Sequence, residues 1–225
     1  MIFQDRIEAG RLLSSRLGGF DQREDVLVLA LPRGGVPVGF EVAQAIHAPL
    51  DVFVVRKLGV PGYEELAMGA LASGGVQLLS EETIRALGIS PDRVDAVIES
   101  EKSELERREQ LYRGDRQASD AAGHTVIVVD DGMATGLTMR AAVIALRQRG
   151  ARQIIAAAPT ASESACREVE AVADDLVCLD VPPQFIAVGQ WYRDFSQTSD
   201  EEVRELLARA AKRVESGSPE RKRMV

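Results

Sequence analysis

The chain has 225 residues and a formal net charge of −8, from 35 acidic and 27 basic side chains. Apolar residues make up 45% of it, which is ordinary for a folded enzyme and too high for a disordered chain. This length allows one α/β domain or two small ones. An acidic chain is unsuited to coating nucleic acids, which requires a basic surface, so we expect no nucleic-acid partner. A local cationic pocket for a small anion remains compatible with the charge.

Several common kinds of segment and site are missing from the sequence. No apolar run is long enough to span a bilayer, and polar residues follow the first three positions, so we expect no membrane partner and no signal peptide. Cys166 and Cys178 lack metal-site spacing and are expected to be reduced thiols of a cytoplasmic protein. His47 and His124 stand alone, which disfavours a zinc site and a histidine-based triad.

The first third of the chain predicts a parallel βαβ unit. Its opening segment has the spacing of an amphipathic helix with Ile7, Leu12 and Leu13 on one face. Two short, continuously apolar segments follow and have the pattern of buried parallel strands. In chain order we expect a helix over 5–17, a strand over 26–32, a helix over 38–46 and a strand over 51–55.

The middle of the chain interrupts this alternation. Residues 65–79 predict a hairpin that turns at Ser73-Gly74-Gly75. Two helices are expected next, one starting at Ser80 and one at Ser90, where Pro91 takes the first helical position. The second half of the latter helix mixes acidic and basic residues, which is typical of a solvated surface.

From residue 125 the alternation resumes, with strand starts about every 25 residues, as in a doubly wound sheet. We expect strands over 125–129, 153–158 and 176–179, helices over 136–149 and 162–172, and a last helix from Ser199. The first of these helices would bury a stripe formed by Leu137, Ala141, Ile144 and Ala145. Residues 182–197 break the pattern, and residues 216–225 form a basic tail that we expect to be disordered.

Charged and glycine-rich residues follow three of the predicted strands. Arg33-Gly34-Gly35 follows the first, Arg56-Lys57 the second, and Asp130-Asp131 the strand over 125–129. Because open α/β sheets bind ligands beyond the carboxyl ends of their strands, we expect these groups to meet at one edge. The chain has four lysines in all, and Lys57 is the one within the first hundred residues.

The segment after the strand over 125–129 has the chemistry of a sugar-phosphate site. Thr135, Gly136 and Thr138 form a turn at the start of a helix, where backbone N–H groups suit a phosphate dianion. The carboxylates of Asp130 and Asp131 suit ribose hydroxyls or a hydrated Mg²⁺ ion.

This segment resembles the phosphoribosyl-pyrophosphate (PRPP) motif of type I phosphoribosyltransferases: four apolar residues, two acids, three variable residues, then Thr-Gly-x-Thr. The resemblance extends over about residues 26–195. It implies that family's α/β fold, a mostly parallel doubly wound sheet flanked by helices with a small hood. It also implies Mg²⁺-dependent transfer of ribose 5-phosphate from PRPP to a nitrogen of a nucleobase-like acceptor, with release of pyrophosphate. On this basis the 5′-phosphate is bound by Ala134, Thr135, Gly136, Leu137 and Thr138.

The resemblance also assigns the charged residues. Asp130 and Asp131 would hold the ribose hydroxyls and position Mg²⁺ through water, and they form the predicted catalytic set together with Arg33 and Lys57. Arg33, Gly34, Gly35 and Lys57 would bind the pyrophosphate. A cis peptide is expected between Arg33 and Gly34, and a mobile catalytic loop is expected over about residues 58–68.

Four of the ten aromatic residues lie between positions 185 and 195, in a segment that resembles the hood of purine-salvage members. Phe185 or Trp191 would stack on the base, and the backbone of Val188 or Tyr192 would read its edge. Asp194 would bind the base, or a second metal ion through water. Members acting on 6-oxopurines usually carry an aspartate at the position of Ala134, whereas adenine-using members carry alanine, so the acceptor stays open.

We therefore expect one phosphoribosyltransferase domain over residues 1–215, with a core over about 23–180 and a hood formed by 1–22 and 181–214. The resemblance favours a homodimer. One alternative is a non-catalytic sensor of PRPP or nucleotides on the same fold, and another is hydrolysis of a phosphoribosyl compound. A phosphoaspartyl receiver domain is disfavoured, because its acidic pair would follow the first strand.

Overall fold

Two β-sheets organise the chain in the computed structural model, which describes residues 1–217 apart from the side chains of residues 65 and 214–217. The parallel sheet has the strand order β2-β1-β6-β7-β8, and the antiparallel sheet has the order β3-β4-β5. The parallel strands are β1 (Val26–Ala30), β2 (Leu50–Val52), β6 (Thr125–Val129), β7 (Gln153–Thr160) and β8 (Asp175–Asp180). The antiparallel strands are β3 (Val55–Val60), β4 (Tyr63–Ala72) and β5 (Val76–Leu79).

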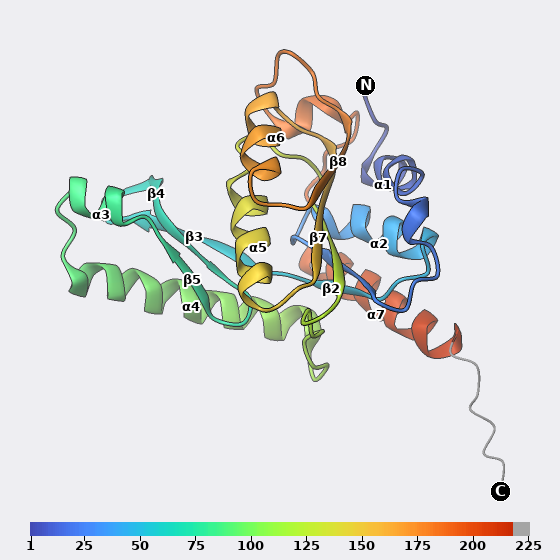
Figure 1. Cartoon of the computed structure of the whole chain (residues 1–225), viewed down its shortest axis with the longest axis horizontal. Helices are drawn as coiled ribbons and strands as arrows, with labels where there is room; N and C mark the ends of the chain where they lie inside the picture. Colours follow the sequence, from blue (N-terminus) through green and yellow to red (C-terminus); the bar gives the residue numbers. More distant parts are fainter. Residues whose placement is uncertain (218–225) are drawn as a thin grey trace, which may run out of the picture.

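Helices cover both faces of the parallel sheet (Figure 1). The helices are α1 (Arg6–Ser14), α2 (Gly35–Ala45), α3 (Glu81–Ala86), α4 (Pro91–Arg113), α5 (Leu137–Gln148), α6 (Glu163–Glu170) and α7 (Asp200–Gly217), with 3₁₀ turns η1 (Gly18–Phe20) and η2 (Val188–Trp191). Of these, α3 and α4 pack against the antiparallel sheet. Alternate side chains of β1 point to opposite layers. Val28 packs in a core with α1, α2 and α7, whereas Leu29 packs in a second core with α5 and α6. Buried on both faces, β1 and β6 need the continuous apolar runs that their sequences show.

The order of the parallel strands creates a switch point between β1 and β6. From β1 the chain winds outward to β2, and it later returns on the other side of β1 to form β6 and then β7 and β8. β1 and β6 are parallel neighbours in register from Val26 opposite Thr125 to Ala30 opposite Val129. The α/β fold with a parallel sheet flanked by helices is therefore confirmed.

Helix α1 buries Leu13 but not the other two residues predicted to share its apolar face. Ile7 and Leu12 are exposed, and the buried residues are Ala9, Gly10 and Leu13. A Cβ atom on Gly10 would come within 2.8 Å of the Val38 carbonyl oxygen in α2. The two helices therefore approach too closely for large side chains, and small residues outcompete the apolar ones for the interface. In α5, similarly, Leu137 is exposed instead of belonging to the buried stripe.

Residues 55–79 form a three-stranded arm that extends away from the parallel sheet (Figure 1). The predicted turn at 73–75 joins β4 to β5, as expected. The segment expected to be a mobile loop over 58–68 instead pairs as the antiparallel hairpin of β3 and β4, which turns at Gly62 with φ +86°. The predicted strand over 51–55 ends at Val52, because β3 of the arm already begins at Val55.

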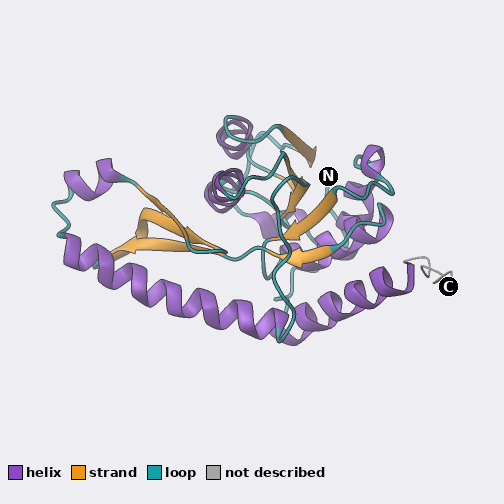
Figure 2. Cartoon of the chain, turned by 60° about the horizontal axis from the view of Figure 1, so that its bottom comes forward, coloured by secondary structure: helices purple, strands orange, loops and turns teal. Residues whose placement is uncertain are grey.

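Helix α4 runs along the arm, and its C-terminal end contacts α7, as Figure 2 shows. Val94 and Ile98 pack in the same core as Leu58 and Val60 of β3. Its second half is largely solvated, as the mixed charges predict, but Leu105 and Tyr112 are buried. Within residues 1–217, no helix combines the length and the apolar character needed to cross a membrane.

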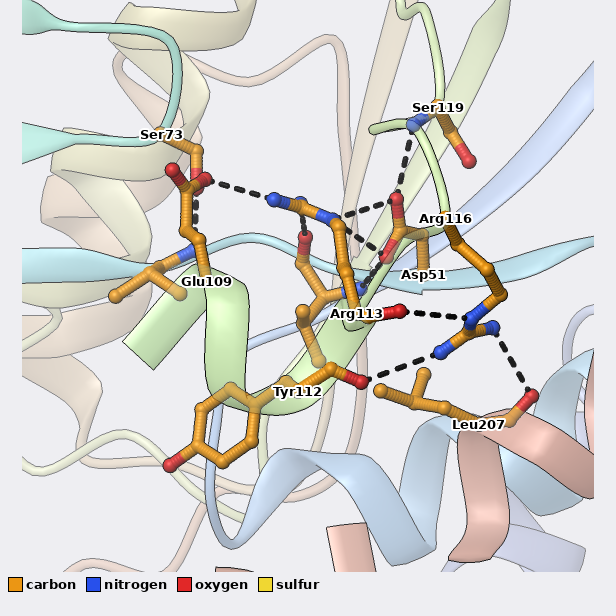
Figure 3. A network of polar contacts seen from close by, with 10 residues as sticks. Asp51, Ser73, Glu109, Tyr112, Arg113, Arg116, Ser119 and Leu207 are labelled. Carbon is orange, nitrogen blue, oxygen red and sulfur yellow. Dashed lines mark hydrogen bonds and ion pairs between the residues drawn. The ribbon is translucent and has the colours of Figure 1, made fainter. Parts of the chain in front are cut away.

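A buried ion pair fixes the end of α4 to the parallel sheet (Figure 3). Arg113 Nε lies 3.0 Å from Asp51 Oδ1, and the two side chains are 8% and 7% exposed. The guanidinium also donates to the Val52 carbonyl oxygen of β2 and pairs with Glu109, while the Ser119 N–H donates to Asp51. Every partner is thus hydrogen-bonded, which is the condition for a buried charge pair to be tolerated.

Arg113→Ala should destabilise the protein by about 3–5 kcal/mol, because it leaves the Asp51 carboxylate buried without its cation. Urea unfolding of the full chain measures this loss. The matched control is Arg107→Ala, which removes a 58% exposed side chain that pairs with Glu104 on the same helix and should leave stability almost unchanged. Equal destabilisation by the two variants would contradict the anchoring role of Arg113.

Candidate active site

The loop after β1 packs directly on the end of β6, at the switch point of the sheet. A Cβ atom on Gly35 would lie 2.6 Å from the Val129 carbonyl oxygen, and one on Gly34 would overlap Asp131 Oδ2. Glycine is therefore required at both positions by close approach. The structure thus brings the predicted pyrophosphate loop and the predicted acid pair into contact.

This loop contains a cis peptide bond between Pro32 and Arg33. The cis bond therefore lies one residue before the position expected, which was between Arg33 and Gly34. A cis bond before a residue other than proline has no local sequence signature, so the resemblance located the loop but not the bond within it.

Asp130 and Asp131 lie at the end of the buried strand β6, largely withdrawn from solvent. The Asp131 N–H donates to Asp130 Oδ1 at 2.9 Å. Burial raises the pKa of Asp130, and the neighbouring charge of Asp131 raises it further. Burial also raises the pKa of Asp131, against which the cation of Arg6 acts. Two adjacent carboxylates with little water around them form a site that favours a bound cation.

The same donor set fits Mg²⁺. Magnesium is commonly held by one or two carboxylates together with substrate phosphates, and it keeps several of its waters. Within residues 1–217 there is no cluster of three or more histidine, cysteine or acidic side chains that could hold a metal ion without a substrate. Asp130 and Asp131 therefore suit an ion that completes its coordination with water or with substrate phosphates.

Arg6, which the sequence analysis did not single out, reaches the acid pair from α1. Its Nε donates to Asp131 Oδ2 at 2.8 Å, and its Nη1 donates to the Ser196 carbonyl oxygen at 2.7 Å. Its guanidinium carbon lies 4.0 Å from the centre of the Phe195 ring. No sequence signal marks this residue, because 125 positions separate it from Asp131 and nothing distinguishes it from the other arginines.

The loop over residues 134–138 forms the N-terminal end of α5. Gly136 is the residue before the helix and has a φ of +73°, which glycine adopts without strain. Ser162, before α6, donates from Oγ to the Ala134 carbonyl oxygen at 2.7 Å and fixes the loop. Thr135, Leu137 and Thr138 are exposed beside the first turn of α5, whose N–H groups have no partner within the helix. The loop therefore has the geometry of an anion site.

The basic residues of the predicted pyrophosphate site lie in two places. Arg33 pairs at 3.8 Å with Asp200 at the start of α7, and Asp200 accepts a hydrogen bond from Tyr112. Lys57 lies on β3 of the arm. With Arg56 it lines a cavity of about 530 Å³ between the β3–β4 hairpin and α4. The loop carrying Arg33 thus meets the acid pair, whereas Lys57 belongs to the second sheet.

The N-terminal segment pairs with the aromatic segment beside the acids. The Phe3 N–H donates to the Trp191 carbonyl oxygen, and the Arg193 N–H donates to the Phe3 carbonyl oxygen, both at 2.8 Å. The Tyr192 hydroxyl donates to the Asp131 carbonyl oxygen at 2.6 Å, and burial raises the pKa of Tyr192. Residues 3–6 and 191–196 thus form one unit beside Asp131.

The other residues predicted to bind the acceptor lie within or beside the unit formed by residues 3–6 and 191–196. Phe185 and Trp191 stack with ring centres 6.0 Å apart, and Val188 packs so closely on Gly132 that a Cβ there would lie 2.5 Å from its Cγ1. Asp194 is exposed, and the Ser196 N–H donates to its Oδ1, which lowers its pKa. The Trp191 Nε1 atom is buried and has no hydrogen-bond partner within the described residues.

Comparisons with known proteins identify the family of this chain. The family model described as a phosphoribosyl transferase domain matches residues 4–194. The chain belongs to the phosphoribosyltransferase family. Two relatives from Mycobacterium tuberculosis, named "Putative phosphoribosyl transferase" Rv0571c and MT0597, are 45% identical over 209 residues, which is 93% of this chain and 47% of each relative. The chain therefore spans about half the length of these phosphoribosyltransferase relatives.

A solved structure supports the fold. The protein TT1426 from Thermus thermophilus is 39% identical, and the two superpose with a TM-score of 0.82 over 93% of this chain and 99% of that chain. The predicted resemblance to phosphoribosyltransferases and the predicted fold class are thus confirmed.

The contact between the glycine loop and β6 predicts a sharp difference between glycines. Gly35→Ala should cost about 1–3 kcal/mol of stability, because its methyl group meets the backbone of Val129. Gly19→Ala is the control, since nothing lies within 4 Å of a Cβ at that position. Urea unfolding compares the two variants, and equal tolerance of both would show that the loop does not pack against β6 in solution.

Proposed function

We propose that this phosphoribosyltransferase transfers ribose 5-phosphate from Mg²⁺-bound PRPP to a nitrogen of a nucleobase-like acceptor and releases pyrophosphate. The contact of Gly34 and Gly35 with the end of β6 carries the proposal, because it joins a pyrophosphate loop to a ribose-binding acid pair. The anion-binding turn before α5 follows the same strand, a few residues after Val129. Family membership supports PRPP as the donor.

Each part of the donor has a matching group at this sheet edge. The turn formed by Ala134, Thr135, Gly136, Leu137 and Thr138 would hold the 5′-phosphate with backbone N–H groups and two hydroxyls. Asp130 and Asp131 would accept hydrogen bonds from the ribose hydroxyls. Arg33 and the backbone of Gly34 and Gly35 would bind the pyrophosphate, to which the hairpin would bring Lys57.

The chemistry required of the protein is mainly electrostatic. When bound, Mg²⁺ neutralises the leaving pyrophosphate. Arg33 and Lys57 would add positive charge at the same oxygens, while the carboxylates would lie near the ribose as it becomes positively charged. The protein also orients the acceptor nitrogen towards C1 of the ribose and excludes water, which would otherwise attack that carbon. No side chain is needed as a general base if the acceptor binds as its reactive tautomer.

The acceptor would bind beneath a hood formed by residues 1–22 and 181–214. Phe185 and Trp191 supply apolar ring surface, and the Trp191 Nε1–H, which is buried without a partner within the described residues, would become a donor to the acceptor if the ring turns on binding. Val188, Tyr192 and Asp194 complete the proposed acceptor set. An aromatic wall with such a donor suits a planar heterocycle that carries a hydrogen-bond acceptor on its edge.

The direct test incubates the full chain with PRPP and Mg²⁺ against a panel of purines, pyrimidines and other nitrogen heterocycles. We expect pyrophosphate release that depends on one acceptor class. Release without any acceptor would indicate hydrolysis. Tight PRPP binding with no release under any acceptor would indicate a sensor. Either result would overturn the proposed transfer.

Asp131→Asn should lower kcat/KM by about 100-fold or more, because the neutral amide no longer stabilises the developing charge. The melting temperature should show that the fold is retained. Asp175→Asn is the matched control. Asp175 is exposed and stands at the start of β8, at the edge of the sheet opposite to Asp131, and it accepts a hydrogen bond from the neighbouring Leu176 N–H. An Asp131→Asn enzyme with the kcat/KM of the natural chain would contradict the site assignment.

Trp191→Phe should raise KM for the acceptor by about 10-fold while leaving KM for PRPP unchanged. The variant keeps ring surface but loses the Nε1–H donor. The free protein should lose only the packing of the larger indole ring, because the lost donor has no partner within the described residues. Steady-state kinetics and thermal unfolding measure the two effects. An unchanged acceptor KM would show that the ring alone matters.

A further inference from the structure

One cation of this chain already occupies the carboxylate that PRPP and Mg²⁺ would need. Arg6 and Asp131 are 11% and 13% exposed, so their ion pair is largely buried. Asp131 Oδ2 is the oxygen that Gly34 of the pyrophosphate loop also approaches. In the free protein, Arg6 therefore lies where the ribose side of the site and the pyrophosphate loop meet.

The geometry of this pair is suited to exchange. Arg6 gives only its Nε–H to the carboxylate within the described contacts, whereas its Nη1–H goes to the Ser196 carbonyl oxygen. This is a single hydrogen bond and not the two-pronged fork that makes arginine–carboxylate pairs strongest. Phe195 and Ser196 would still hold the guanidinium if the carboxylate were released. Arg6 can thus leave Asp131 without losing its other partners.

A cation at this place also answers an electrostatic requirement. Asp130 and Asp131 are adjacent, shielded from water and mutually repulsive, so the free site is stabilised by a positive neighbour. A divalent ion beside the same carboxylates would meet the same requirement. Arg6 and the metal then compete for one negative site, since both cannot fully occupy Asp131 Oδ2.

We propose that Arg6 is a displaceable counter-cation, which holds Asp131 in the free protein and gives it up to Mg²⁺–PRPP. This inference rests on the proposed function, because it assumes that PRPP uses Asp131. Arg6 belongs to the unit formed by residues 3–6 and 191–196. Release of Asp131 therefore also removes one of the contacts between the hood and the end of β6. Arg6 is accordingly a positioning residue, which acts on substrate through Asp131.

Metal binding without PRPP tests the competition independently of turnover. Mn²⁺ is the probe, and its dissociation constant is measured by electron paramagnetic resonance of the free ion. Arg6→Gln should bind Mn²⁺ about 5-fold or more tightly than the natural chain, since the competing charge is gone. Arg6→Lys, which retains a cation, should stay close to the natural chain.

Arg11→Gln is the matched control. Arg11 lies on the same helix and forms an ion pair of similar length with Glu41, but its side chain is 70% exposed and pairs away from the acids. It removes the same net charge and should leave Mn²⁺ affinity unchanged. In the Asp131→Asn background the effect of Arg6→Gln should disappear. Unchanged or weaker Mn²⁺ binding by Arg6→Gln would overturn the proposal.

A measurement on the natural chain covers the case in which Arg6→Gln fails to fold. In nitrogen-15 NMR, the Arg6 Nε–H signal should be protected from exchange in the free protein and should shift or lose protection when Mg²⁺ and PRPP are added. A signal unaltered at saturating Mg²⁺–PRPP would refute the exchange. The two proposals fail separately: absence of turnover refutes transfer, whereas the Mn²⁺ series and the NMR signal judge Arg6.

Discussion

The close contact between the loop after β1 and the end of β6 is the constraint on which the site depends. Because β1 and β6 are parallel neighbours in register, their carboxyl ends lie side by side, and whatever follows them must share a small space. Gly34 and Gly35 meet this demand by presenting no side chain to Asp131 and Val129. The glycine loop and the carboxylates that follow β6 therefore lie in direct contact.

That packing places two carboxylates close together and away from water, and this unfavourable arrangement determines which groups surround them. Two adjacent carboxylates withdrawn from water need a cation, and α1 supplies one through Arg6. The pairing of Phe3 with the Trp191–Arg193 backbone and the Tyr192 hydroxyl on the Asp131 carbonyl hold this cation in place. Segments from the two ends of the described chain therefore meet at the acid pair. The proposed acceptor wall thus forms around the cation that the acids of the proposed donor site require.

Local pattern predicted what local forces decide. The apolar runs of β1 and β6, the serine caps before α3 and α6 and the turn before α5 follow from neighbouring residues alone. Long-range packing decided the rest. The buried face of α1 depends on how closely α2 approaches, and residues 58–68 form strands because β3 and the start of β4 fold back and pair with each other. Arg6 could not be predicted, because its partner Asp131 is distant in sequence and the contact between them forms only once the hood has folded.

The two basic residues assigned to pyrophosphate lie on different parts of the fold, yet one helix connects them. Arg56, next to Lys57, pairs with Glu101 of α4 at 2.7 Å, and Arg33 pairs with Asp200, which accepts a hydrogen bond from Tyr112 of α4. Glu101 and Tyr112 are about three helical turns apart, so they lie on the same face. The adjacent Arg113 is fixed to Asp51 of the parallel sheet. Helix α4 therefore links the two parts, because the helix that contacts the hairpin of Lys57 and the loop of Arg33 is itself anchored to the parallel sheet.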